Sequence, residues 1–243
     1  MDPKVNIVIV PYDNPEFFER ALTTALENTN YSNFVVSVVH NPCGDATLDA
    51  QIATIASSKE KLGTVAYLPQ AKNLYHGPAC QIGSDHVPDA KYVLLANDDI
   101  FIPGSQLMWL DRMVEFMETM DTAASVTPCL LSEKEQIYWL GKQNPENPHH
   151  DYLHKPRHFS GIPQNPFMTC YNNMACCLTR KSLLDEFSLK DGPPMYGSDS
   201  GFANRIKDKY PELNHWVIPE IKLYHFNIYY KRINHGKDEV TDG

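Results

Sequence analysis

An alternation of short apolar runs with helix-like segments constrains the fold of this chain more than any other feature of its sequence. The runs with the length and composition of buried strands are VNIVIV (5–10), FVVSVVH (34–40), TVAYLP (64–69) and KYVLLA (91–96). The segments with a helical pattern are found within 11–29, 41–60, 77–87 and 105–120. Because a helix follows each strand, we predict an α/β fold with a mostly parallel central sheet flanked by helices.

The second half of the chain predicts further elements of the same domain. The helix predicted over 105–120 is amphipathic, with an apolar stripe at Leu107, Leu110, Met113, Val114 and Met117. After the Pro-, Asn- and His-rich stretch 141–166 come a strand in NNMACCLTR, a helix over about 198–208 and the apolar segment WVIPEIKLYHF. No internal repeat or low-complexity tract divides the chain, so we expect a single domain over 1–243.

Composition and charge exclude several classes of function. The chain has 243 residues, of which 42% are hydrophobic and 21% charged, as in an ordinary folded protein. A net charge of −9 without any Lys/Arg run argues against a nucleic-acid-binding surface. No apolar stretch approaches the roughly 20 residues of a membrane span. The first apolar run is too short for a signal peptide and the cysteines are scattered, so we expect a cytoplasmic protein.

Clusters of polar residues directly follow predicted strands at 11–14, 40–45 and 97–99. Ligands of parallel α/β sheets bind outside the carboxyl ends of the strands, so we expect these clusters to converge at one edge. The last cluster, Asn97-Asp98-Asp99, places two carboxylates after a buried strand, where burial without a partner is costly. Mg²⁺ or Mn²⁺ shared with a diphosphate would stabilise them. The alternative is an exposed Asp pair that caps a turn.

Several segments resemble, in the same order, the motifs of a known enzyme family. VNIVIVPYDNPEFFERAL resembles its first strand, turn and helix, and VVHNPCGDAT its second strand and turn. NLYHGPACQIG matches N-x-G-x-x-x-A-x-N-x-G at Asn73, Ala79 and Gly83, and YVLLANDDIFIP resembles the strand with the DxD motif. NNMACCLTRKSLL resembles the acceptor-side strand with its Arg, here Arg180, and YGSDSGFANRIK resembles E-D-x-D-L-x-x-R through Asp199. The chain thus resembles the GT-A glycosyltransferases, particularly the inverting group called family 2.

The resemblance implies a metal ion, Mn²⁺ or Mg²⁺, beneath the diphosphate of the donor. Asp99 matches the DxD carboxylate that binds the metal, and Asp98 matches the position near the ribose or sugar. Asn97 replaces the first Asp of the motif, which leaves less negative charge for the metal. His225 falls where many such enzymes place a further metal ligand. The alternative for His225 is a side chain packed between its neighbours in the sequence.

The resemblance also implies a nucleotide site in the loops after the first strands. Pro11, Tyr12 and Asp13 match the loop that holds the base. His40 stands where the family usually has an Asp that reads uracil, a departure that weakens the assignment of the base. The motif positions that complete the predicted nucleotide site are Asn41 and Asn73.

Asp199 matches the position of the general base. In an inverting transfer, a carboxylate on the acceptor side takes the proton of the attacking hydroxyl, while a metal neutralises charge on the leaving diphosphate. Ser198 and Gly201 replace two other acidic positions of the motif, which leaves Asp199 as its sole carboxylate. The alternative is a helix N-cap at Ser198 or Asp199, and both roles are compatible.

The implied function is a metal-dependent inverting transfer of a sugar from a nucleotide diphosphate, preferably a UDP-sugar, to a hydroxyl of a glycan or small acceptor. Residues 1–103 would bind the donor, and residues 104–243 would bind the acceptor and end in a tail. We expect the stretch 141–166 to bind the acceptor, since its histidines fit no standard zinc spacing. The basic tail around Lys231 and Arg232 would be a solvated terminus or a lid.

Two other functions remain open. A sugar nucleotidyltransferase shares the sheet and the metal carboxylates, but PYDNPEFF lacks the Gly-rich, basic loop of that class. A catalytically inactive module would keep the fold and bind a nucleotide or glycan. The departures at Asn97 and His40 and the missing second carboxylate near 199 favour the inactive module. Activity is favoured by the residues that are retained, namely Asp98, Asp99, Asp199 and His225.

Overall fold

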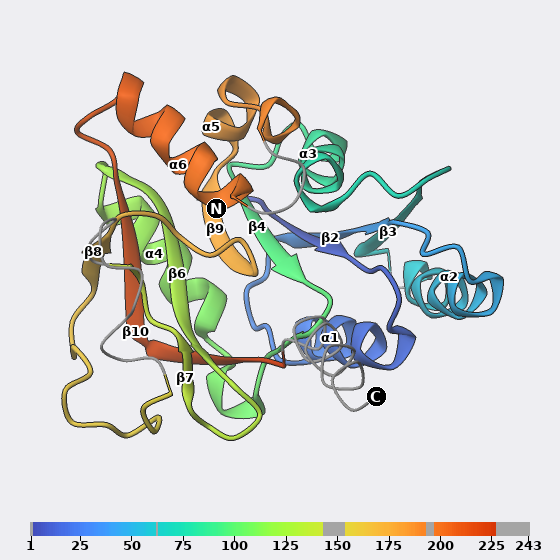
Figure 1. Ribbon diagram of the computed structural model, residues 1–243, viewed down its shortest axis with the longest axis horizontal. Coiled ribbons are helices and arrows are strands. Elements are labelled where there is room, and N and C mark those ends of the chain that lie inside the picture. Colours follow the sequence, from blue (N-terminus) through green and yellow to red (C-terminus); the bar gives the residue numbers. More distant parts are fainter. Residues whose placement is uncertain (1, 62, 143–153, 193–196, 227–243) are drawn as a thin grey trace, which may run out of the picture.

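The computed structural model describes residues 2–61, 63–142, 154–192 and 197–226 (Figure 1). The strands are β1 (Val5–Val10), β2 (Phe34–His40), β3 (Val65–Pro69), β4 (Tyr92–Asn97), β5 (Ile100–Phe101), β6 (Ala123–Leu131), β7 (Ile137–Trp139), β8 (Phe167–Thr169), β9 (Cys176–Arg180) and β10 (Asn214–His225). The helices are α1 (Pro15–Glu27), α2 (Ala46–Glu60), α3 (His76–His86), α4 (Trp109–Thr119), α5 (Lys181–Glu186) and α6 (Ser198–Lys209). Short 3₁₀ turns occupy Gly104–Gln106 and Leu189–Asp191.

All strands of the described residues join one mixed sheet, in the order β3-β2-β1-β4-β9-β6-β10-β5. The first four strands of this order pair in parallel, as the alternating sequence predicts. Strand β9 inserts antiparallel between β4 and β6, and β6 pairs in parallel with β10. Strands β5 and β8 pair antiparallel with β10, and β7 with β6. The predicted α/β fold with flanking helices is confirmed. Because β4 pairs with β9 and β5 with β10, the sheet is continuous across residue 103.

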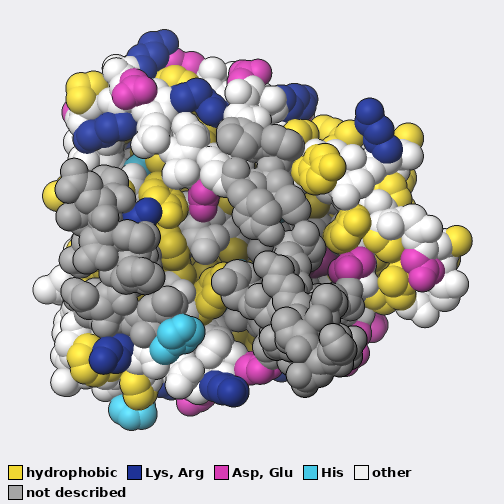
Figure 2. Space-filling model, viewed as in Figure 1, with side chains coloured by type: hydrophobic (Ala, Val, Ile, Leu, Met, Phe, Trp, Pro, Cys, Tyr) yellow, Lys and Arg dark blue, Asp and Glu magenta, His cyan; other side chains and the backbone are white. Residues whose placement is uncertain are grey.

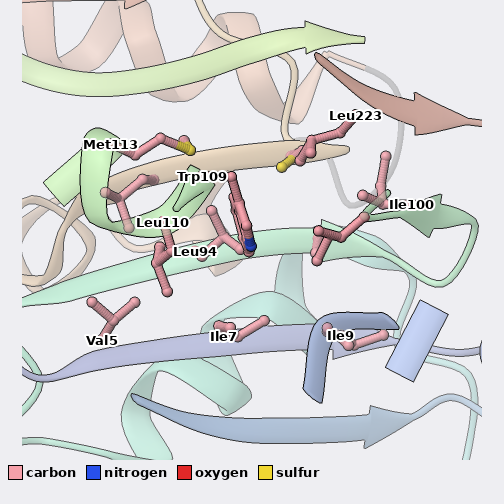
Figure 3. Close-up of a cluster of buried hydrophobic side chains, with 14 of the residues drawn as sticks. Val5, Ile7, Ile9, Leu94, Ile100, Trp109, Leu110, Met113 and Leu223 are labelled. Carbon is pink, nitrogen blue, oxygen red and sulfur yellow. The ribbon is translucent and has the colours of Figure 1, made fainter. Parts of the chain in front are cut away.

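Helices cover both faces of the sheet, and successive side chains of β1 point alternately to one face and to the other. Val5, Ile7 and Ile9 pack in a cluster with side chains of α1, α2 and α4. Val8 and Val10 pack in a second cluster with side chains of α3, α5 and α6, the helices along the top of Figure 1. Figure 3 shows the first cluster, in which the β1 side chains lie near Leu94 and Trp109. Burial on both faces explains why VNIVIV is continuously apolar.

The helix predicted over 105–120 is shorter than its apolar stripe indicates. A 3₁₀ turn occupies Gly104–Gln106, and α4 begins at Trp109. The Trp109 indole is buried and donates to the Thr29 hydroxyl at 3.0 Å, which fixes the start of the helix. Leu107 lies before this point and is 38% exposed, so its assignment to the buried stripe is wrong. The other residues of the stripe are buried as predicted, namely Leu110, Met113, Val114 and Met117.

Arg180 does not lie on the acceptor side, contrary to the resemblance. It pairs with Tyr92 at the beginning of β4, whereas the polar clusters follow the ends of the parallel strands. Its Nε donates to the Ala123 carbonyl at 2.8 Å, and its Nη2 lies within 3.3 Å of three carbonyl oxygens in or after the last turn of α4. A cation at the carbonyl end of a helix stabilises it. Arg180 therefore holds α4 against the sheet.

Gly83 lets α3 approach β1 closely, and we expect Gly83→Ala to destabilise the fold. A Cβ atom there would lie 2.4 Å from Val8 Cγ1 and 3.0 Å from Val39 Cγ2, both on buried side chains. Overpacking of this kind costs about 1–3 kcal/mol, whereas alanine gains only about 1 kcal/mol in helix propensity. Urea unfolding measures the net loss. An unchanged midpoint of unfolding would show that α3 can move away from β1 and β2 at little cost.

Two predictions based on composition can be compared with the described residues. No helix among them has the length and apolarity that a membrane crossing requires. All six cysteines are free thiols, and those at 80, 129, 176 and 177 are buried. They act as small core residues, and the cytoplasmic location stays a prediction.

Candidate functional site

The polar clusters after β1, β2 and β4 meet at one edge of the sheet, as predicted. Val10 and Asn97 are register partners at the ends of β1 and β4, so the loops that follow start side by side. The Tyr12 N–H donates to Asp98 Oδ2 at 3.2 Å, and the Asn41 N–H donates to the Pro11 carbonyl at 3.1 Å. The loop that contains Asp13 is thereby tied to both neighbouring strands.

Two adjacent carboxylates lie at the centre of this edge in a setting that is unfavourable for negative charge. Asp99 is 8% exposed. Burial raises the pKa of Asp98 above its ordinary value, and the negative charge of Asp99 contributes to the rise. The backbone hydrogen bond from Tyr12 acts in the opposite direction. A positive charge placed here would therefore stabilise both carboxylates in their ionised form.

His225 joins this pair from the far end of the chain. The antiparallel pairing of β10 with β5 sets His225 opposite Ile100, directly after the carboxylates. His225 Nε2 lies 3.1 Å from Asp99 Oδ1 and 3.5 Å from Asn97 Nδ2. The buried imidazole packs edge-on against the Tyr138 ring, with ring centroids 4.5 Å apart. The ring that packs on His225 thus comes from β7, not from its sequence neighbours.

Asp99 Oδ1 and His225 Nε2 are in direct contact, and the same separation fits two adjacent ligands of a divalent metal ion. Adjacent ligands of an octahedral ion with bonds of about 2.1 Å stand about 3 Å apart, close to the 3.1 Å observed. A carboxylate oxygen such as that of Asp99 is a ligand that suits Mg²⁺ or Mn²⁺. No group of three or more His, Cys, Asp and Glu side chains within the described ranges is arranged around a common metal position.

His40 has both ring nitrogens bonded within the protein. Nδ1 lies 2.8 Å from the Tyr67 hydroxyl and Nε2 lies 3.2 Å from Asp49 Oδ1. Asp49 also accepts from the Cys43 N–H at 3.0 Å, which orders the turn after β2. A contact between His40 and a bound base stays a prediction, and it would require His40 to exchange one of these bonds.

Asn41 and Asn73 lie near the site edge, and their side chains shape the loop that leads into α3. Asn41 Nδ2 donates to the Tyr75 carbonyl at 3.1 Å, and Asn41 Oδ1 accepts from the Leu74 N–H at 3.2 Å. Asn73 Oδ1 accepts from the Tyr75 N–H at 2.7 Å. Their direct contact with a nucleotide stays a prediction. In the structure, the two asparagine side chains fix the conformation of this loop through their hydrogen bonds to its backbone.

Asp199 lies at the second position of α6 and is half-buried. Burial raises the pKa of its carboxyl, while the Ser200 N–H, 2.8 Å from Oδ1, and the positive charge of Lys142 lower it. The N-cap of the helix is Gly197 with φ 80°, so the predicted cap at Ser198 or Asp199 is wrong. The left-handed conformation of Gly197 starts the helix one residue earlier.

Strand β9 brings Asp199 to the same edge as the carboxylate pair. The first residue before β9, Ala175, accepts from the Asn97 N–H at 2.9 Å. Burial raises the pKa of the Cys177 thiol on β9 to about 12, and the nearby charge of Asp199 contributes. On the face seen in Figure 2, charged side chains gather along the top and hydrophobic ones lie nearer the middle. The start of α6 and the end of β4 thus both lie near the start of β9.

Solved structures share this architecture. The mannosyltransferase PcManGT from Pyrobaculum calidifontis, in complex with GDP-Man and Mn²⁺, matches with a TM-score of 0.65 and 14% identity over 93% of this chain and 57% of its own. GalNAc-T7 with UDP, GalNAc and Mn²⁺ matches with a TM-score of 0.70 and 10% identity, over 92% of this chain and 43% of its own. TarS 1–349 from S. aureus matches with a TM-score of 0.62 and 14% identity, over 92% of this chain and 60% of its own.

The fold is the GT-A glycosyltransferase fold. No protein-family model matches the sequence, and comparison with curated proteins finds no match. The chain spans about half the length of the solved proteins, between 43% and 60%. Those proteins were solved with nucleotides and Mn²⁺ in two of the three cases.

Within this GT-A fold, several residues that lie near the site edge of the sheet were not predicted from the sequence. Burial lowers the pKa of His76, and its interactions with Asn97 and the charge of Asp99 place it beside the motif after β4. Lys142 lies close enough to Asp199 to affect its pKa. A His within NLYHGPACQIG was a visible signal for His76. No sequence pattern connects Lys142 or Tyr138 with residues so far along the chain.

Parts of the predicted acceptor side and tail lie outside the described residues, namely 143–153 and 227–243. Of the histidines in 141–166, the structure describes His154 and His158. The neighbouring Arg157 donates to Glu135 at 2.8 Å, so this part of the stretch packs beside the turn before β7. Acceptor binding by 141–166 stays a prediction.

Proposed function

We propose that this chain is a metal-dependent inverting glycosyltransferase that uses a nucleotide diphosphate sugar, with a UDP-sugar as the preferred donor. The observation that supports this most is the convergence of Asp98, Asp99 and His225 at the sheet edge of a GT-A fold. Two of the solved proteins of this fold, PcManGT and GalNAc-T7, hold GDP-Man or UDP together with Mn²⁺, and we extend that chemistry to this chain as part of the proposal. The acceptor would be a hydroxyl of a glycan or another small molecule.

On the donor side, Asp99 and His225 would hold Mn²⁺ or Mg²⁺. When bound, the ion supplies positive charge that stabilises the leaving diphosphate. Asp98, fixed by the Tyr12 N–H, would be oriented toward the ribose or sugar. The loop Pro11–Asp13 would hold the base. Its backbone is fixed for this role by hydrogen bonds to the residues that follow β2 and β4.

On the acceptor side, Asp199 would act as the general base. Its carboxylate would accept the proton of the attacking hydroxyl as the bond to the anomeric carbon forms, and the nucleoside diphosphate would leave from the opposite face. A raised pKa makes the carboxylate a stronger base than an exposed Asp. The nearby charge of Lys142 lowers the pKa of Asp199 and so favours the ionised, proton-accepting form of the carboxylate.

Thermal unfolding with nucleoside diphosphates tests the donor side of this proposal. UDP, GDP and dTDP would each be added with and without Mn²⁺, with CMP as a nucleotide that lacks the diphosphate. A ligand at 100 times its Kd adds about 2.7 kcal/mol, which corresponds to about 5–10 °C for a chain of this size. We expect UDP to stabilise the fold only with Mn²⁺. If no nucleotide does so, the proposal fails.

The pH dependence of transfer tests the acceptor side. Because a general base works only when it is ionised, kcat should fall as the pH drops through the pKa of Asp199. Burial raises that pKa above the ordinary value of 3.8, so the inflection should lie above pH 3.8. The measurement is kcat against pH at saturating donor and Mn²⁺. An acidic limb that persists unchanged in Asp199→Asn would show that another group titrates.

A further inference from the structure

Tyr75 has backbone angles that almost only glycine adopts. Its φ is 64° and its ψ is −179°. A side chain in this region is strained, and it stays there only when its surroundings fix the conformation. Such residues cluster at ligand sites, where the strain holds a group ready for binding.

Asparagine side chains hold Tyr75 in place. Asn73 accepts from its N–H at 2.7 Å, and Asn41 donates to its carbonyl at 3.1 Å. Asn41 also accepts from the Leu74 N–H at 3.2 Å. These bonds use the backbone of Tyr75 and leave its side chain out. Tyr75 is the N-cap of α3 without a side-chain capping bond, so the helix does not need the tyrosine ring either.

The ring of Tyr75 is a large exposed aromatic group at the site edge. The residue is 49% exposed, although a tyrosine would usually bury more of its ring. On one side, Asn41 connects it to the loop of Pro11 through the Asn41 N–H. On the other side, His76 interacts with Asn97 at the end of β4. Tyr75 therefore belongs to the rim of the edge where β1, β2 and β4 end.

We propose that Tyr75 stacks on the base of the bound nucleotide, an inference that rests on the proposed function. Every nucleobase has an aromatic face, and a base gains affinity by stacking on an aromatic side chain. A ring held in advance by the backbone loses little freedom when the ligand binds. The base, rather than the acceptor, is the favoured partner because Asn41 ties Tyr75 to the loops after β1 and β2, where the base is proposed to bind. The proposed general base, Asp199, lies instead at the start of α6.

Two variants separate a stacking role from a structural one. Glycine adopts the backbone angles of Tyr75 without strain, so Tyr75→Gly should leave the free protein at least as stable in thermal unfolding. The same variant should bind UDP with Mn²⁺ about 5- to 100-fold more weakly by calorimetry, since one stacked base is lost. Tyr75→Phe keeps the ring and should bind UDP within about 2-fold of the wild type.

Pyrophosphate with Mn²⁺ provides a probe that lacks a base. Its affinity should be equal for the wild type and Tyr75→Gly. If Tyr75→Gly weakens pyrophosphate as much as UDP, or binds UDP as well as the wild type does, the stacking role is wrong while the proposed function stands. A KM increase confined to the acceptor would place the ring on the acceptor side and also overturn it. If the wild type binds no nucleoside diphosphate, both proposals fall.

Discussion

Asp199→Asn should lower the rate of sugar transfer by about 10²- to 10⁴-fold, which is the usual contribution of a general base. The amide has nearly the same shape and can still accept from the Ser200 N–H, so α6 should keep its start. Because Asp199 is proposed to act on the acceptor hydroxyl and not on the diphosphate, the affinity for the nucleoside diphosphate should change by no more than about 2-fold. The measurement combines kcat for transfer with calorimetric titration of the nucleotide and Mn²⁺.

Asp208→Asn is the matched control, because Asp208 is exposed near the other end of the same helix. It removes the same charge, and both transfer and binding should be unchanged. Transfer that survives in Asp199→Asn would contradict the assignment of the base. Loss of transfer and of nucleotide binding together would show that the substitution disturbs the fold of the site instead.

Asp99→Asn should remove the Mn²⁺-dependent binding of the nucleotide. Changes in the groups that merely orient metal ligands cost about 10- to 100-fold in metal affinity or activity, and loss of a direct ligand should cost at least about 100-fold. The neutral amide also removes the negative charge beside Asp98. The site then attracts a cation less strongly. Titration of UDP at several Mn²⁺ concentrations measures the effect, with the thermal stability of the free protein recorded alongside.

His225→Gln extends this test to the second proposed ligand, and Asp121→Asn, at an exposed position outside the site edge, serves as the charge control. The expected order of Mn²⁺ affinity is wild type and Asp121→Asn together, then His225→Gln, then Asp99→Asn. Equal Mn²⁺ dependence in Asp99→Asn and wild type would assign the carboxylate to the alternative role of a turn cap. A loss in Asp99→Asn alone would restrict His225 to packing against Tyr138.

The sequence by itself determined the parallel half of the sheet and the position of the site along it. Strand β1 and strand β2 have the predicted bounds, because continuous apolar runs and turn residues are local signals. The convergence of Tyr12, Asn41 and Asp98 followed from one rule, that parallel strands present their carboxyl ends at the same edge.

The family resemblance named His225 and Asp199, but only the tertiary structure decided how residues so far apart in the chain come together at that edge. Pairing of β10 with β5 brings His225 to Asp99, and insertion of β9 carries Asp199 toward β4 while it takes Arg180 to the opposite end. The strained backbone of Tyr75 depends on Asn41, from another loop. Contacts between residues far apart in the chain arise from strand pairing and side-chain packing, and no local pattern of the sequence encodes them.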